Sequence, residues 1–276
     1  MIMVLGITGT GKSTFINFLK PDSVQVGNTL ESGKIQFLEC KRENNLSEVF
    51  PTVDTPGFDD SKLSDAAIFT QIAEYLAAQF SLGIPLRGMI YIHQIQGTRM
   101  RGSEKQSLKT FERLCQGPTN LRNVMFLTTG WDSFQDPRIL ARREQELIKK
   151  YWTPMMQRGA RVERFPETQD QAKHLIMKLV SEGEDLVFDI QPELLMQEKR
   201  TSGASMAEWY KEHFGQEMDK SIGARIQEKI RKEKNKLRYK LSALKGSRAL
   251  IQVFSSVVGI ILVSLNFFTI FGAIGM

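Results

Sequence analysis

The sequence predicts an α/β protein with a doubly wound, mostly parallel sheet, followed by a helical extension and an apolar C-terminal helix. Short apolar runs alternate with segments of helical periodicity, which is typical of parallel sheets covered by helices on both faces. A glycine-rich turn joins the first apolar run to the first helical segment, and the last 28 residues carry no charge. The 276 residues suffice for one such domain and a smaller appendage.

The elements follow one another in order along the chain. A strand at 2–5 ends at Gly6, and the first helix follows Ser13. Ser103 and Gln106 have the spacing of a capping box at a later helix start. Further strands are expected at 48–57, 89–95, 123–129 and 160–165, and further helices after Ser64, Ser103 and Asp136 and across 172–180. Apolar residues at helical spacing then predict an extended helix outside the sheet, namely Ile222, Ile226, Ile230, Leu237, Leu241 and Leu244.

The net charge of +6 is local rather than spread over the protein. Residues 225–248 hold ten Lys or Arg and two Glu, a net charge of +8, so the rest of the chain has 27 basic and 29 acidic residues. A near-neutral body argues against nucleic-acid binding, which requires a basic face. The two cysteines, Cys40 and Cys115, exclude a disulfide scaffold, and three scattered histidines give no metal-binding pattern.

Residues 6–14 read GITGTGKST and match the motif G-x-x-x-x-G-K-[ST] in full. In this motif, backbone N–H groups converge on a phosphate, and side chains at the glycines would block its approach. Lys12 is expected to contact the β- and γ-phosphates and the Ser13 hydroxyl to bind Mg²⁺. The expected phosphate-binding residues are Gly6, Thr8, Gly9, Thr10, Gly11, Lys12, Ser13 and Thr14.

Two later segments indicate which nucleotide is bound. VDTPG (53–57) resembles the D-x-x-G element of GTPases, which implies that Asp54 holds Mg²⁺ through water and that the Gly57 N–H senses the γ-phosphate. TTGWD (128–132) occupies the place of the base-reading N-K-x-D motif, with Asp132 placed to accept hydrogen bonds from guanine. Thr129 and Gly130 depart from that motif. GTP is still favoured over ATP, but the evidence for guanine is weaker than the evidence for nucleotide binding. RFPETQD (164–170) occupies the region of a third base-binding motif without matching one.

Together these motifs, with FDDSKLSD after DTPG, resemble the septin-related and immunity-associated (GIMAP-type) P-loop GTPases, most closely their fungal relatives. The resemblance covers about residues 2–182. It implies a P-loop GTPase domain, GTP or GDP with Mg²⁺ as ligands, Lys12 and Gly57 as catalytic groups, and homodimers formed through the nucleotide faces.

Hydrolysis is expected to be slow. Efficient GTPases that use a glutamine after D-x-x-G orient water with it, and Phe58 stands at that position here. Lys34 falls where the family has its switch threonine, while Thr29 is nearby but out of register. Asp59, Asp60 and His93 are further polar candidates, for which a helix cap, a surface charge and a strand-end histidine are the alternatives.

The apolar segment predicts a membrane anchor. Residues 253–274 supply 22 positions without charge, and about 20 apolar residues span a bilayer. The preceding basic stretch predicts that the nucleotide domain is cytoplasmic. We therefore expect a GTPase domain at 1–182, a basic helical extension at 183–248 and a tail anchor at 249–276. The leading hypothesis is a membrane-anchored switch; the alternatives are a nucleotide-dependent membrane scaffold with little hydrolysis and a C-terminal helix that remodels membranes.

Overall fold

The structure is a computed structural model. The part of the chain that it describes contains a six-stranded sheet. Its strand order is β2-β3-β1-β4-β5-β6; the β2–β3 pair is antiparallel and every other neighbouring pair is parallel. The described residues are 1–19, 35–41, 47–60, 63–97, 99–132, 136–181, 185–196 and 205–242. The strands are β1 (Ile2–Gly6), β2 (Ile35–Lys41), β3 (Ser47–Asp54), β4 (Gly88–Gln94), β5 (Val124–Thr129) and β6 (Arg161–Arg164).

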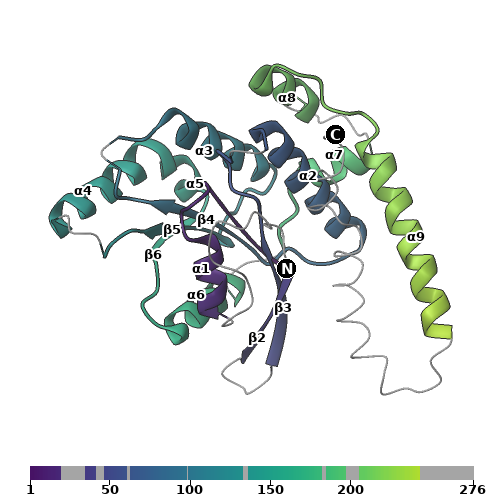
Figure 1. The fold of residues 1–276 in the computed structure, drawn as a ribbon, viewed down its shortest axis with the longest axis horizontal. Helices are drawn as coiled ribbons and strands as arrows, with labels where there is room; N and C mark the ends of the chain where they lie inside the picture. Colours follow the sequence, from purple (N-terminus) through teal and green to yellow (C-terminus); the bar gives the residue numbers. More distant parts are fainter. Residues whose placement is uncertain are drawn as a thin grey trace.

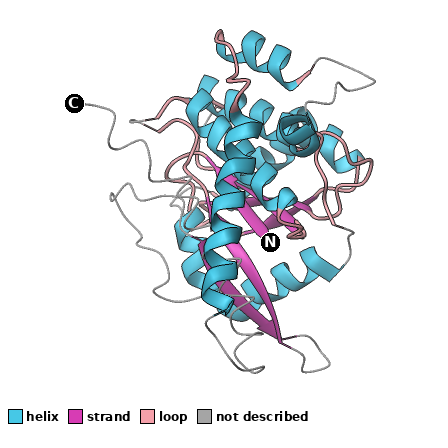
Figure 2. Cartoon of the chain, turned by 90° about the vertical axis from the view of Figure 1, so that its right-hand side faces the viewer, coloured by secondary structure: helices cyan, strands magenta, loops and turns pink. Residues whose placement is uncertain are grey.

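Helices cover both faces of the sheet (Figures 1 and 2). The helices are α1 (Lys12–Leu19), α2 (Asp65–Ser81), α3 (Gly102–Leu114), α4 (Pro137–Leu147), the π-helical turn η1 (Ile148–Trp152), α5 (Thr153–Gln157), α6 (Gln169–Ser181), α7 (Ile190–Met196), α8 (Met206–Phe214) and α9 (Ile222–Ser242). One apolar core packs α1 and α6 against Ile90 and Ile92 of β4. The other packs α2, α3 and α4 against Met89 and Tyr91, the alternate side chains of the same strand.

The helices after residue 185 pack against the same body. Helices α7 and α9 contact α2, and Ile222, Ile226 and Ile230 of α9 are buried. Arg225 of α9 also forms an ion pair with Glu74 of α2, with 3.2 Å between nitrogen and oxygen. The repeated isoleucines therefore bury one stripe of α9, while Arg225, Arg231 and Lys232 are exposed.

The predicted alternation of strands and helices and the mostly parallel sheet are confirmed. The antiparallel edge strand β2 and the short helices α7 and α8 were not predicted. The expected capping box at Ser103 is wrong, because α3 already begins at Gly102. There the Glu104 carboxylate accepts a 2.6 Å hydrogen bond from the Arg101 N–H, two residues earlier than the expected pair.

The predicted anchor at 249–276 lies outside the described residues. Of the helices that are described, none combines the length and apolar character needed to cross a membrane.

Candidate functional site

The glycine turn lies between β1 and α1, at the carboxyl end of the sheet. Gly6 has a φ of +142°, and a Cβ there would lie 2.4 Å from the carbonyl oxygen of Ile92 in the neighbouring strand. Only glycine therefore lets β1 approach β4 so closely at this point. Gly9 and Gly11 also have positive φ angles, and no atom lies within 3.4 Å of a Cβ built at either one. The backbone of the turn is thus open toward a ligand.

Lys12 begins α1 and is almost buried, with 7% of its surface exposed. Its ammonium donates hydrogen bonds to the carbonyl oxygens of Gly6 at 3.2 Å and Ile7 at 2.9 Å. These bonds hold the charge across the inside of the turn. A phosphate in the turn would meet this ammonium together with backbone N–H groups, which is the arrangement that binds polyphosphates.

The segment after β3 contacts the turn directly. The Thr8 N–H donates a 3.0 Å hydrogen bond to the Phe58 carbonyl oxygen, and Ile7 and Phe58 form a parallel bridge. A Cβ at Gly57 would lie 2.5 Å from the Thr8 nitrogen and 2.7 Å from the Lys12 ammonium. The two motifs found in the sequence therefore meet at Gly57, and a side chain there would occupy the space beside the ammonium.

Ser13 and Asp54, the expected Mg²⁺ ligands, belong to neighbouring elements. Ser13 is the second residue of α1, and Asp54 ends β3 in register with Val4 of β1. A hydroxyl and a carboxylate are oxygen donors of the kind that Mg²⁺ prefers, and Mg²⁺ usually takes its other ligands from water and substrate phosphates. This donor set fits the ion. No cluster of three or more His, Cys, Asp or Glu occurs among the described residues.

A cavity of about 680 Å³ adjoins the turn. Its size is within the range of sites for small molecules and cofactors. Some of the residues that line the cavity were predicted from the sequence to bind the nucleotide, and others were not. It is lined by Gly9, Thr10, Gly11, Thr14, Phe18, Gln94, Gln96, Thr129, Gly130, Trp131, Asp132, Phe165, Pro166 and Glu167.

The end of β5 is hydrogen-bonded to the turn. The Thr129 hydroxyl donates to the Thr10 carbonyl oxygen at 3.0 Å, so the residue that replaces the usual asparagine links the two halves of the cavity. Gly130 has a φ of +86°, which glycine adopts at little cost. Asp132 is exposed at the cavity wall.

Aromatic rings form much of the remaining wall. The Trp131 indole N–H donates to the Thr128 hydroxyl at 3.0 Å, and the Arg164 guanidinium lies 3.6 Å from the centre of the Trp131 ring. Phe165 packs edge-on against Phe15 and Phe18 of α1, with ring centres 5.9 and 5.7 Å apart. The sequence placed RFPETQD in the right region but could not show that Phe165 packs against α1.

The remaining candidates that the structure describes do not line this cavity. Phe58 is fully buried in the core. Asp59 has a φ of +62°, and its backbone N–H donates to the Asp65 carboxylate at 2.9 Å; Asp60 is half-buried. His93 is buried on the α3 side of β4, where its ring packs edge-on against Trp152. Residues 29 and 34, the alternatives for the switch threonine, lie outside the described residues.

Known proteins resemble this chain in fold rather than in sequence. No protein-family model and no curated protein sequence matches it. The crystal structure of Toc33 from Arabidopsis thaliana in complex with GDP and Mg²⁺ superposes with a TM-score of 0.51 at 14% identity, covering 68% of this chain and 87% of that one. A variant of Era from Aquifex aeolicus bound to GDP and AlF4⁻ gives a TM-score of 0.46 at 19% identity, covering 70% of this chain and 62% of that one. The described residues therefore share the fold of Toc33.

Proposed function

We propose that the chain is a guanine-nucleotide-binding switch that takes GTP or GDP with Mg²⁺ and hydrolyses GTP slowly. The observation that carries this proposal is the meeting of Lys12, the open glycine turn and Gly57 at one point beside the 680 Å³ cavity. The Toc33 structure, which contains GDP and Mg²⁺ in the same fold, supports it.

Each group has a distinct role in this proposal. Lys12 and the N–H groups of the turn bind the phosphates, and the Gly57 N–H binds the terminal phosphate. Ser13 and Asp54 would hold Mg²⁺, which neutralises charge on the phosphates when bound. The Asp132 carboxylate accepts hydrogen bonds from the N1 and N2 hydrogens of guanine, which adenine does not offer in that place.

Slow hydrolysis follows from Phe58. Its buried benzyl side chain can neither accept a proton nor orient a water molecule, so the chain lacks the usual glutamine. We propose that turnover rises when two nucleotide faces meet in a homodimer, as the resemblance to septin-related and GIMAP-type GTPases implies.

We further propose that residues 249–276 anchor the protein in a membrane, with the nucleotide domain on the cytosolic side. The support is the uncharged run of 28 residues and the +8 stretch before it. Fractionation of the full chain against a variant that ends at Arg248 tests this point. An unchanged membrane-bound fraction would refute the anchor.

A nucleotide-dependent membrane scaffold is the second candidate, and the buried Phe58 favours it. The two functions differ in turnover. Single-turnover hydrolysis by the full chain at rising protein concentration should accelerate for a switch that works as a dimer. A rate that stays near zero at every concentration supports the scaffold, and a fast rate independent of concentration contradicts both.

Calorimetric titration of the full chain with GTP, GDP and ATP, each with Mg²⁺ and with EDTA, tests nucleotide binding itself. We expect GTP and GDP to bind at least about tenfold more tightly than ATP, because a pair of hydrogen bonds to a base edge is worth about 1–3 kcal/mol. EDTA should weaken GTP binding more than GDP binding. Equal affinity for ATP would refute guanine selectivity, and no binding at all would refute the function.

A further inference from the structure

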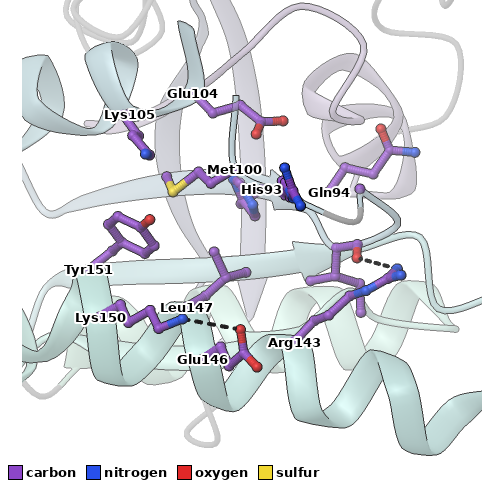
Figure 3. A pocket seen from close by; sticks show the side chains of 13 residues that line it. His93, Gln94, Met100, Glu104, Lys105, Arg143, Glu146, Leu147, Lys150 and Tyr151 are labelled. Atoms are coloured by element: carbon purple, nitrogen blue, oxygen red, sulfur yellow. Dashed lines mark hydrogen bonds and ion pairs between the residues drawn. The ribbon is translucent and has the colours of Figure 1, made fainter. Parts of the chain in front are cut away.

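A second cavity opens at the carboxyl end of β4 (Figure 3). It lies on the face of the sheet opposite α1. Its volume is about 300 Å³, at the lower end of the range for small-molecule sites. It lies between the start of α3 and the side of α4 and η1. Of the residues that line it, only Gln94 also lines the nucleotide cavity.

His93 forms its inner wall. The side chain is only 4% exposed, and its ring nitrogens make no hydrogen bond with any residue that the structure describes. Burial lowers the pKa of His93, so the ring is neutral near pH 7 and offers one donor and one acceptor. The ring can therefore exchange a hydrogen bond with the polar head of a ligand in the cavity.

The rim is positively charged. Arg99 and Lys105 are exposed, and neither forms an ion pair within the described part of the chain. Lys150, which pairs with Glu146, and Arg143 also line the cavity (Figure 3). The two carboxylates of the lining, Glu104 and Glu146, are already engaged: the first with Arg101, the second with Lys150 and Arg142. The electrostatic environment therefore favours an anion.

The other walls are apolar. Ile95 and Leu147 are buried, and Met100 and Tyr151 are half-buried. Figure 3 shows Met100, Tyr151 and Leu147 around the same space as His93. A ligand that fills this cavity would bury an apolar body of limited size and leave its charge toward the rim.

The cavity shares a wall with the nucleotide cavity. The Arg143 guanidinium donates to the Gln96 carbonyl oxygen at 2.8 Å, and the Gln96 side-chain amide donates to the Gly130 carbonyl oxygen at 3.2 Å. Gln96 and Gly130 line the nucleotide cavity, whereas Arg143 lines the second one. An anion beside Arg143 would therefore act on a side chain that is connected to Gly130 by two hydrogen bonds through Gln96.

We propose that this second cavity binds a small organic anion, a carboxylate or phosphate on a compact apolar body, and that this ligand changes the affinity of the nucleotide site. The effect on the nucleotide rests on the proposed function, whereas binding itself does not. By linkage, the nucleotide changes the affinity for the anion by the same factor.

NMR of the full-length protein with isotope-labelled histidine allows binding to be measured without nucleotide. The chain has only three histidines, so their ring signals can be followed separately. Phenyl phosphate is the probe, and inorganic phosphate and phenol are its charged and apolar halves. We expect saturable movement of the His93 ring signals alone, with a Kd of about 1 mM or below and at least about tenfold weaker binding of either half. No movement of the His93 signals, or equal movement of His174 and His213, would overturn the site.

Lys105→Gln supplies a variant that should fold, because its side chain is exposed. It should weaken phenyl phosphate binding about threefold to tenfold, as expected for loss of one partly screened charge. Lys109→Gln, exposed on the same helix but outside the cavity lining, should leave binding unchanged. Equal effects of the two substitutions would contradict the proposed location.

Titration of GTP with saturating phenyl phosphate tests the coupling. We expect a change in GTP affinity of about threefold or more, in the usual range for coupled sites. Binding of phenyl phosphate with no change in GTP affinity would overturn the effector role. A chain that binds no nucleotide would refute the proposed function, and the His93 titration would then decide the site by itself.

Discussion

The phosphate turn and the base-side cavity are built in two different ways. Nine consecutive residues, 6–14, supply the end of β1, the turn and the start of α1, where backbone groups and the Lys12 ammonium are placed to bind phosphate. The base side is assembled from side chains far apart in the sequence, such as Phe18, Trp131 and Phe165. A site made of backbone keeps a recognisable motif, whereas a site made of side chains can keep its shape while its residues change.

Lys12→Ala should have the largest effect, because it removes the only side-chain charge assigned to the phosphates. Loss of a hydrogen bond to a charged group is worth about 1.5–3 kcal/mol, or about 10- to 100-fold in GTP affinity. Calorimetry measures this loss, with the exposed Lys109→Ala as control. Undiminished GTP affinity would show that the turn does not bind phosphate.

Asp132→Asn tests the base side of the comparison. A pair of hydrogen bonds to a base edge is worth about 1–3 kcal/mol, so GTP should bind about 30-fold more weakly. Xanthosine triphosphate should gain affinity, because the new amide can donate to the oxygen that replaces the guanine amine. Equal loss for GTP, GDP and ATP would mean that Asp132 does not read the base.

Gly57→Ala tests the contact between the two motifs. The new methyl group would crowd the Thr8 nitrogen and the Lys12 ammonium, and overpacking of this kind costs about 1–3 kcal/mol. We expect GTP affinity to fall about tenfold. Gly102→Ala is the matched control, since a Cβ there meets no atom within 4 Å.

Arg164→Gln should have the smallest effect. It removes the cation above Trp131, worth about 0.5–1 kcal/mol at an exposed site, and a surface ion pair with Glu144. Trp131 fluorescence should change, while GTP affinity stays within about threefold. A loss as large as that of Asp132→Asn would mean that the Trp131–Arg164 stack, rather than the carboxylate, controls the base site.

The sequence predicts the parts of the fold that local pattern determines. Gly6, Lys12 and Asp54 lie at the ends of β1, α1 and β3, within a few residues of the predicted boundaries, because glycine, capping and apolar periodicity act over short distances in the chain. Strand β2 was not predicted because its pairing with the antiparallel strand β3 defines it. The expected cap at Ser103 is wrong because the Glu104 carboxylate accepts a hydrogen bond from the Arg101 N–H, two residues earlier.

The base-side cavity was only partly predictable for the same reason. Asp132 and Thr129 stand within a recognisable segment, but Phe18, Gln96 and Phe165 reach the cavity through tertiary packing. No spacing in the sequence relates α1 to the segment after β6. Aromatic residues near those strand ends were the only available signal, and most such residues serve the core.

Helix α9 gives the molecule a spacer of defined length. Its 21 residues form a rod of about 31 Å, whose first turns are fixed to α2 and α7 (Figure 1). For a chain held in a bilayer by residues 249–276, this rod would limit how far the nucleotide face can stand from the lipid headgroups. It would also tie the orientation of that face to the direction of the rod, so that neighbouring molecules on one membrane would approach each other from a restricted set of angles.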